Sequence, residues 1–321
     1  MEFTLTAITK RLTAMVFVWI TVSIIIFFTT QLLPGDIAVM KLGQHATPEA
    51  LAALRGKWGL NEPVYSQYFS WITSFARGDF GKSLSMMEVE IHPLLFHRLK
   101  NSSILAVLAF GVIAIVGISF GVIGALKKGS LLDGLVTLFA YAGMSTPEFV
   151  TGVVLIMLLC GVVFNILPSY GYVELSKGFF PWIKHLILPI FTTSILLLAY
   201  VMRMTRVNMI EVLQKDYVRT ARLKGLSERV VIFRHVLRNA LIPTVTLIFL
   251  NLGWLVGGLV IVENVFAYPG VGRLILQAIN MRDIPLLQAS AMSVASVYIL
   301  ANFLADLVCG WLNPKLRVPK E

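Results

Sequence analysis

Charge is scarce in this sequence. Charged residues make up 14% of the 321 positions, whereas soluble domains carry about 25%. Apolar residues make up 57% of the chain and recur in long runs. This composition argues against a soluble domain and predicts a polytopic membrane protein. Acidic residues are the rarer charge, with 17 Asp and Glu against 27 Lys and Arg. We expect the excess positive charge in cytoplasmic loops rather than on a nucleic-acid-binding surface.

Cysteine and histidine are also rare. The two cysteines, Cys160 and Cys309, lie in apolar runs and form no metal-binding motif, so free buried thiols are expected. The five histidines lie in loops or at the ends of apolar segments: His45, His92, His97, His185 and His235. These absences argue against a metal site. They also argue against an intramembrane hydrolase, which needs a nucleophile and a base within the spans.

Six apolar segments are long enough to cross a bilayer as helices, which takes roughly 20 residues. The predicted all-α fold therefore has spans at 12–31, 102–126, 149–167, 185–202, 241–262 and 286–311. Basic residues precede the first span (Lys10, Arg11), follow the second (Lys127, Lys128) and end the chain. By the positive-inside rule, both termini are then cytoplasmic.

This topology divides the chain into an N-terminal tail with the first span, a small external helical insertion, a membrane core with five spans and a cytoplasmic tail (1–32, 33–100, 101–312 and 313–321). Within the insertion we expect one helix beginning at Pro48 with Thr47 as its N-cap, and a second over 64–75. The aromatic side chains of the second helix have two readings, anchoring at the membrane interface or packing on the ends of the spans.

One motif in the insertion resembles a phosphate-binding loop and is rejected. Residues 76–83 read ARGDFGKS, so Ala76 stands where the G-x-x-x-x-G-K-S pattern needs its first Gly. No alternation of strand, loop and helix surrounds the segment, and the topology places it away from cytosolic ATP. We therefore expect no nucleotide site here.

Polar residues within the spans are few, and two are candidates for a transport pathway. Glu148 follows a break at Pro147; its side chain either lines the pathway or reaches the interface. Residues 131–145, before this break, are expected partly in or along the cytoplasmic half of the membrane. Asn251 lies in mid-span and either faces substrate or, the favoured reading, hydrogen-bonds a neighbouring helix. Four glycines of the second span are either close-packing points or ordinary membrane-helix glycines: Gly111, Gly117, Gly121 and Gly124.

The loop over 203–240 is basic, with nine Lys and Arg against three acids, and is predicted to be two short helices around a turn. Gly225 suits the left-handed C-terminal position of the first helix, and Ser227 can cap the second. One face of the second helix is predicted to be apolar: Phe233, Val236, Leu237, Ala240 and Leu241. Either this pair docks a cytoplasmic protein, or its charge only sets topology.

The external segment before the last span is predicted to contain a tight turn at Tyr268-Pro269-Gly270 and a short amphipathic helix over 271–280. The segment over 263–285 reads ENVFAYPGVGRLILQAINMRDIP.

Together these motifs resemble the integral membrane permeases of binding-protein-dependent ABC importers of the dipeptide/oligopeptide/nickel class. The cytoplasmic motif YVRTARLKGLSE and RHVLRNALIP, over 217–243, matches the loop of that class. The external motif, over 263–285, matches its E-x-V-F-x-x-P-G-x-G-R-L and R-D-x-P pattern. LPGD at 33–36, WGLNEPVYSQY at 58–68 and GDFGKS at 78–83 match as well. The resemblance covers essentially the whole chain.

The resemblance implies a type I ABC importer permease whose cytoplasmic helix pair inserts into an ATPase subunit. The residues carried over to this coupling loop are Arg219, Thr220, Ala221, Lys224, Gly225, Leu226, Ser227 and Leu237. Four positions depart from the general importer loop, because Arg219, Thr220, His235 and Arg238 replace its Glu, Ala, Ile and Pro. The external motif contributes Glu263, Pro269, Gly270, Gly272, Arg273 and Asp283.

The implied partners are a second homologous permease, two cytoplasmic ATPase subunits, an external solute-binding protein and the lipid bilayer. ATP and Mg²⁺ would be bound by the ATPase subunits, so this chain is not itself an enzyme and holds no cofactor. The implied location is a bacterial or archaeal plasma (inner) membrane. The substrate stays open among peptides, nickel chelates, opines and sugars. The rival reading is a stand-alone secondary transporter or channel, which would more often show inverted repeats and intramembrane carboxylates.

Overall fold

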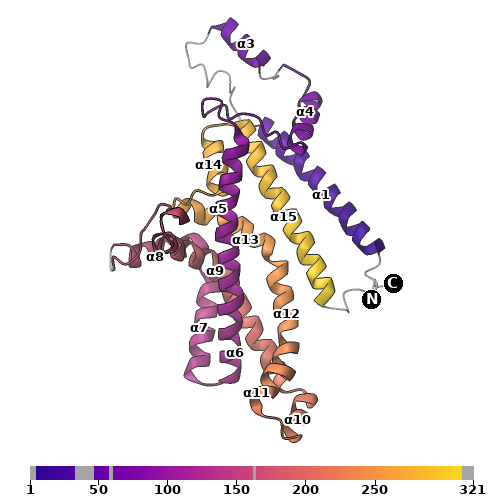
Figure 1. Cartoon of the computed structure of the whole chain (residues 1–321), viewed down its shortest axis with the longest axis vertical. Coiled ribbons are helices and arrows are strands. Elements are labelled where there is room, and N and C mark those ends of the chain that lie inside the picture. The colour runs from indigo at the N-terminus through magenta and orange to yellow at the C-terminus, as the bar shows by residue number, and fades with distance from the viewer. Residues whose placement is uncertain (1–4, 33–46, 58–60, 162–163, 313–321) are drawn as a thin grey trace. The chain divides into compact units, whose positions relative to one another are not determined.

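The computed structural model describes residues 5–32, 47–57, 61–161 and 164–312 (Figure 1). Four sequence features fall outside this range, in whole or part: the LPGD segment, His45, the start of WGLNEPVYSQY and the C-terminal tail. Within it, regular structure is helical, with only isolated β-bridges. The helices are α1 (Leu5–Gln31), α3 (Pro48–Lys57), α4 (Val64–Ala76), α5 (Ile91–Val112), η1 (Ile113–Gly117), α6 (Ile118–Leu126), α7 (Leu131–Ser145), α8 (Glu148–Leu159), η2 (Leu175–Lys177), α9 (Phe179–Leu213), α10 (Asp216–Leu223), α11 (Glu228–Val230), η3 (Val231–Val236), α12 (Leu237–Leu250), α13 (Leu252–Val265), α14 (Val271–Asn280) and α15 (Ile284–Leu312).

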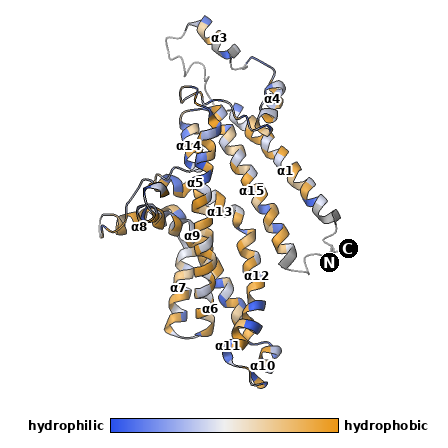
Figure 2. Cartoon of the chain, viewed as in Figure 1, coloured by the Kyte–Doolittle hydropathy of each residue, from blue (hydrophilic) through white to orange (hydrophobic). Residues whose placement is uncertain are grey.

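Among the described residues, five continuous helical stretches are long and apolar enough to cross a membrane, and apolar residues cover most of their length (Figure 2). They are Thr9–Gln31, Ile91–Leu126, Phe179–Leu213, Glu228–Leu250 and Ile284–Gly310. The bent pair of α7 and α8 makes a sixth candidate span. The prediction of an all-α polytopic protein is confirmed.

Three spans differ in their bounds from the prediction. The second begins at Ile91, so the last ten residues of the expected insertion are helical and continuous with it. The fourth is a 35-residue helix, α9, that carries Arg203 and Arg206 within it rather than in a loop. The fifth begins at Glu228 and is interrupted at Asn251, between α12 and α13. Hydropathy underestimates the length of these helices, because each helix continues into polar residues beyond its apolar run.

The predicted third span over 149–167 is not one continuous helix. Helix α8 has only 12 residues and ends at Leu159, which gives roughly 18 Å of length at 1.5 Å per residue. The chain bends by 114° between α7 and α8. Pro147 accounts for this break, because it cannot donate a backbone hydrogen bond and disfavours helix at Thr146. Helix α7, expected partly along the cytoplasmic half, packs beside α6 and α9 (Figure 1).

The chain forms two compact units, which are described separately: Met1–Ser102 with Pro269–Leu300, and Ser103–Tyr268 with Ala301–Glu321. In the first unit, the insertion helices begin at the predicted positions, and the Ala50 amide donates to Thr47 Oγ1 at 3.3 Å. The α4 side chains Tyr68 and Trp71 pack on Phe27 of α1, with centroid distances of 5.4 and 5.7 Å. These two aromatic residues therefore pack on a span, whereas Tyr65 and Phe69 are exposed.

The second unit is built around α9, whose buried side chains Leu198, Val201 and Met202 form its main core with Ile113 of η1. Glycine allows close approach of the preceding span. A Cβ on Gly121 would lie 2.6 Å from Thr205 Cβ and 2.7 Å from the Met202 carbonyl oxygen. Gly117 and Gly124 also face neighbouring side chains, whereas Gly111 faces open space. Three of the four glycines are thus close-packing points.

Candidate functional site

The basic turn, which we define as residues 215–234, follows α9 and includes the start of the helix that begins at α11. Gly225 has φ +76°, the left-handed conformation that glycine adopts at little cost. Its amide donates to the Arg222 carbonyl oxygen at 2.9 Å, which closes the end of α10 as predicted. The next helix begins after Ser227, also as predicted, but the Ser227 side chain makes no capping hydrogen bond. The predicted position of this cap is confirmed and its bond is not.

A small apolar core lies inside the helix pair and holds the basic turn to the membrane helices. Val218 and Ala221 of α10 are buried against Val231 and Val236 of η3 and Met209 of α9. Of the eight residues carried over to the coupling loop, Ala221 belongs to this core, and Leu237 packs against it. The other six are exposed. The second helix is not short, because it continues without interruption to Leu250.

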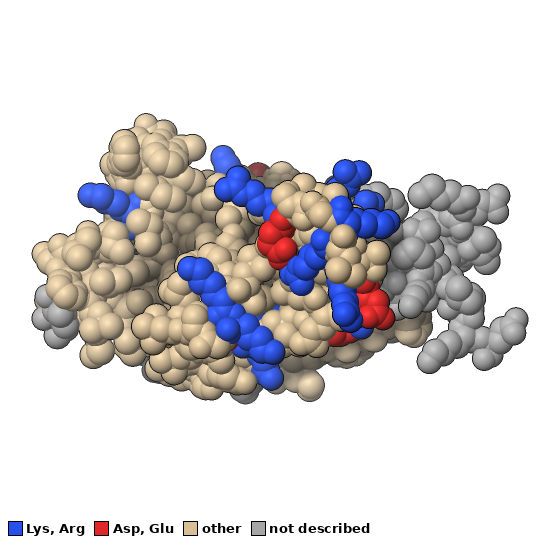
Figure 3. Space-filling view, turned by 90° about the horizontal axis from the view of Figure 1, so that it is seen from below, with Lys and Arg blue, Asp and Glu red and all other residues tan. Residues whose placement is uncertain are grey.

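The outer surface of the basic turn combines cations with large apolar side chains. Leu223 is 80% exposed and Phe233 67% exposed. Exposed cations surround them: Arg219, Arg222, Lys224, Arg229 and Arg234. In the view from below, Lys and Arg side chains gather on this face with few acids (Figure 3). An exposed apolar patch rimmed by one sign of charge is typical of a protein interaction site.

The predicted apolar stripe of the second helix is only partly correct. Val236 and Ala240 are buried, but Phe233 faces outward. The segment Val231–Val236 is a π-helix, in which each turn holds more residues than in an α-helix. The 3.6-residue spacing used for the prediction therefore does not apply across it, and Phe233 leaves the buried face.

Two polar contacts brace the basic turn. Arg222 Nη2 lies 2.6 Å from Glu228 Oε1, across the turn, and this hydrogen bond raises the pKa of the Arg222 guanidinium above its ordinary value. Asn239 Nδ2 donates to the Tyr217 hydroxyl at 3.1 Å. Because both Arg222 and Glu228 are substantially exposed, their pairing positions the turn more than it stabilises the fold.

Sequence reasoning missed a partly buried ion pair that holds α7 on α9. Arg206 donates through Nε and Nη2 to the two carboxylate oxygens of Asp133, at 2.5 and 2.9 Å. Asp133 also accepts from the Gly129 amide, and its own amide donates to Ser130 Oγ. One turn away along α9, Arg203 lies 5.3 Å from the Tyr141 ring centroid. One sequence signal was available. Ser130 precedes an apolar run and is followed three residues later by an acid, Asp133, which is the pattern of a helix N-terminus.

Glu148, the first pathway candidate, is enclosed at the bend. It is 8% exposed, and a Cβ on Gly258 of α13 would lie 2.7 Å from its Oε2. No hydrogen bond to its carboxylate is found among the described residues. One turn along the same face of α8, Gly152 lies against Thr192 of α9. The hydroxyls of Thr192 and Thr193 are buried without a hydrogen-bond partner within the described part of the chain. Glu148 and these two hydroxyls are thus polar groups buried in the second unit.

Asn251, the second pathway candidate, lies at the interruption between α12 and α13. Its Nδ2 donates to the Leu247 carbonyl oxygen at 2.8 Å, in the preceding turn of its own helix. The favoured reading, a hydrogen bond to a neighbouring helix, is therefore wrong. The side chain instead satisfies a carbonyl oxygen at the end of α12.

The external motif is divided between the two units. Glu263 is buried in α13 of the second unit, and the other five residues belong to the first. There, Asn101 Nδ2 donates to the carbonyl oxygen of Pro269, the middle residue of the predicted turn, at 3.0 Å. Helix α14 begins after Gly270, as predicted, with Gly272 buried and Arg273 half-buried.

Asp283 joins the external motif to the GDFGKS segment, 200 residues away in sequence. Its Oδ2 accepts from Ser83 Oγ at 2.5 Å, from the Ser85 amide at 2.9 Å and from Ser85 Oγ at 2.7 Å. Its Oδ1 accepts from the Leu286 amide at 3.2 Å, which caps α15. Asp283 is 1% exposed. The segment that resembles a phosphate loop therefore has its serine hydroxyl engaged in structure. We call this network the Asp283 corner.

The family described as "Binding-protein-dependent transport system inner membrane component" matches residues 117–318, and the corresponding N-terminal family matches residues 4–95. A probable peptide ABC transporter permease protein, y4tP of Sinorhizobium fredii, is 38% identical over 97% of this chain and 98% of its own length. The di/tripeptide transport system permease protein DppB of Pseudomonas aeruginosa is 36% identical over 98% and 99%. The dipeptide permease DppB of Escherichia coli is 34% identical over the same shares.

Proposed function

Because the chain belongs to the family of binding-protein-dependent transport system inner membrane components, we propose that it is the transmembrane permease subunit of an ATP-driven importer for peptides. Relatives that match almost its full length are named as peptide and dipeptide permeases. This favours peptides over nickel chelates, opines or sugars. ATP and Mg²⁺ belong to partner chains in this proposal, and the chain supplies the pathway and the coupling.

The single observation that carries the coupling role is the exposed apolar and cationic surface of the basic turn. Leu223 and Phe233 would fill a groove on a cytoplasmic ATPase subunit, and the surrounding cations would meet an acidic rim. Gly225 has open space where a Cβ would be, so a partner can approach the backbone closely at this position. Movement of the turn would reach the membrane through α9 and α12, since both continue from it without a loop.

The assembly we propose contains a second homologous permease, two ATPase subunits and an external binding protein. Both termini of this chain would be cytoplasmic, in agreement with the positive-inside rule. The pathway would pass near Glu148 and the hydroxyls of Thr192 and Thr193, because polar groups buried within a membrane domain are costly and commonly mark a transport pathway. The external motif would position the outer ends of α14 and α15.

The test measures substrate-stimulated ATPase activity of the reconstituted importer. It compares the native chain with two separate variants at Gly225. Gly225→Trp places a bulky ring on the docking surface, so we expect ATPase stimulation to fall at least 10-fold. Gly225→Asn is the matched control, since Asn tolerates the left-handed conformation better than other residues with a Cβ. It should retain most of the coupling.

The rival reading makes a different prediction for the same proteins. If the chain alone moves peptide in proteoliposomes that lack ATPase subunits, and if Gly225→Trp has no effect, it is a secondary transporter. The basic turn would then serve only as a topology signal.

A further inference from the structure

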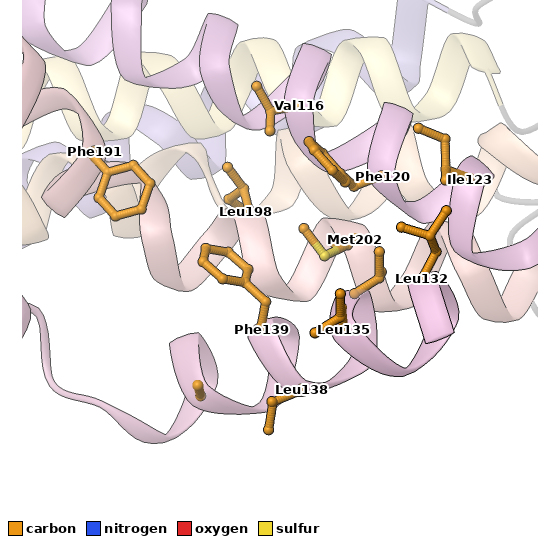
Figure 4. Close-up of a pocket in the computed structure, with 12 residues that line it drawn as sticks. Val116, Phe120, Ile123, Leu132, Leu135, Leu138, Phe139, Phe191, Leu198 and Met202 are labelled. Atoms are coloured by element: carbon orange, nitrogen blue, oxygen red, sulfur yellow. The ribbon is translucent and has the colours of Figure 1, made fainter. Parts of the chain in front are cut away.

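The second unit has a deep groove that the proposed transport cycle does not use. It is enclosed by η1, α6, α7 and α9 and has a volume of about 680 Å³. Side chains from these helices converge on it, with Phe191 and Ile123 toward opposite ends (Figure 4). All 12 side chains that line it are apolar. A peptide could not satisfy its backbone amides and carbonyl groups there, so the groove does not fit the transported substrate.

The length of the groove matches one leaflet of a bilayer. Along α9 it extends from Phe191 to Met202, which is roughly 16 Å at 1.5 Å per residue. One leaflet contributes about 15 Å to a hydrocarbon core of about 30 Å. A transmembrane helix of a second subunit would instead need a groove that continues across both leaflets. The dimensions therefore suit an acyl chain better than a partner helix.

A pair of lysines follows the helix that forms one end of the groove. Ile123 and Leu132 line the groove, and the connection between them contains Lys127 and Lys128, both exposed. Lys127 is one helical turn beyond Ile123. The nearest following acid in sequence, Asp133, is already paired with Arg206. The two ammonium groups are thus placed at the level of lipid headgroups in the cytoplasmic leaflet, the side to which a Lys-Lys pair is oriented.

We propose that this groove binds an anionic phospholipid of the cytoplasmic leaflet. An acyl chain would occupy the space between α6, α7 and α9, and the phosphate would contact Lys127 and Lys128. The lipid would support the packing of α7 on α6 and α9. Exposed side chains such as Leu138, 66% exposed, would then be covered by lipid.

The test is native mass spectrometry of the complete importer, purified in mild detergent and followed by lipid extraction. We expect the native complex to retain phosphatidylglycerol or cardiolipin. The double substitution Lys127→Gln/Lys128→Gln should reduce retained anionic lipid at least five-fold. Both lysines are exposed, so the fold should persist. The control is Lys177→Gln/Lys184→Gln, which changes one exposed lysine of η2 and one exposed lysine near the start of α9 and should leave retention unchanged.

A second variant tests the groove itself. Ala142→Trp adds an indole to the groove wall without changing charge and should also displace lipid. The proposal is overturned if the lysine variant retains as much anionic lipid as the native chain, or if a zwitterionic lipid is retained instead. It is also overturned if no lipid is retained and Leu135→Cys cross-links efficiently to the second permease. The groove would then be a subunit interface.

Discussion

The Asp283 corner and the basic turn are both parts of family motifs, yet their side chains are used in opposite ways. Asp283 is buried, and its carboxylate accepts four hydrogen bonds from Ser83, Ser85 and Leu286. In the basic turn, Leu223, Phe233 and most of the cations are exposed. The Asp283 corner satisfies its polar groups within the chain, whereas the basic turn leaves its side chains exposed to a partner.

This difference separates residues that build the permease from residues that meet a partner. Removing a buried carboxylate leaves the groups that donate to it without an acceptor, so changes at Asp283 should act on folding. An exposed Phe contributes little to the fold but much to an interface that buries it. Substitutions in the two regions should therefore affect different measurements.

The largest effect should follow Asp283→Ala. Loss of the carboxylate leaves the buried donors of Ser83, Ser85 and Leu286 without an acceptor, at a cost of about 1–3 kcal/mol each. We expect at least about 3 kcal/mol of destabilisation, seen as a lowered Tm in detergent and less folded protein. The control is Glu62→Ala, because Glu62 is an exposed acid in the same unit. An unchanged Tm for Asp283→Ala would show that the network is not structural.

An intermediate effect, on binding alone, should follow Phe233→Ala. Because Phe233 is 67% exposed, its loss should leave Tm nearly unchanged. Affinity for the ATPase subunits should fall about 10-fold, equivalent to roughly 1.4 kcal/mol, as measured by binding in nanodiscs. Phe180→Ala is the matched control, since Phe180 is 76% exposed at the start of α9. Equal losses of ATPase affinity in the Phe233 and Phe180 variants would contradict a specific role for Phe233 in binding the ATPase subunits.

The smallest effect should follow Arg222→Ala. The Arg222–Glu228 pair is exposed, with side chains 43% and 56% accessible, and such pairs contribute roughly 0.2–1 kcal/mol. A double-mutant cycle with Glu228→Ala, read from thermal unfolding, should give a coupling energy in this range that decreases in high salt. A coupling energy above about 2 kcal/mol, far outside that range, would place this pair among the structural contacts, with the Asp283 corner.

Much of the architecture could be predicted from local chemistry. The start of α14 and the turn that ends α10 were predicted from local residues. Pro269 fixes its own φ, and Gly225 adopts the left-handed conformation at little cost. The spans were predicted because a membrane helix must satisfy its backbone hydrogen bonds internally and face lipid with apolar side chains. These properties depend on composition and short-range spacing, which a sequence displays directly.

The arrangement of side chains depended on contacts that no local pattern contains. The sequence by itself determined that the chain is an α-helical membrane permease with a basic turn between two spans. Only the tertiary structure decided that the bent pair of α7 and α8 packs on α9, that Phe233 faces outward and that Asp283 bonds to Ser83. The physical reason is that a π-helical turn, a bend at Pro147 and a buried hydrogen-bond network depend on which distant groups meet in the fold.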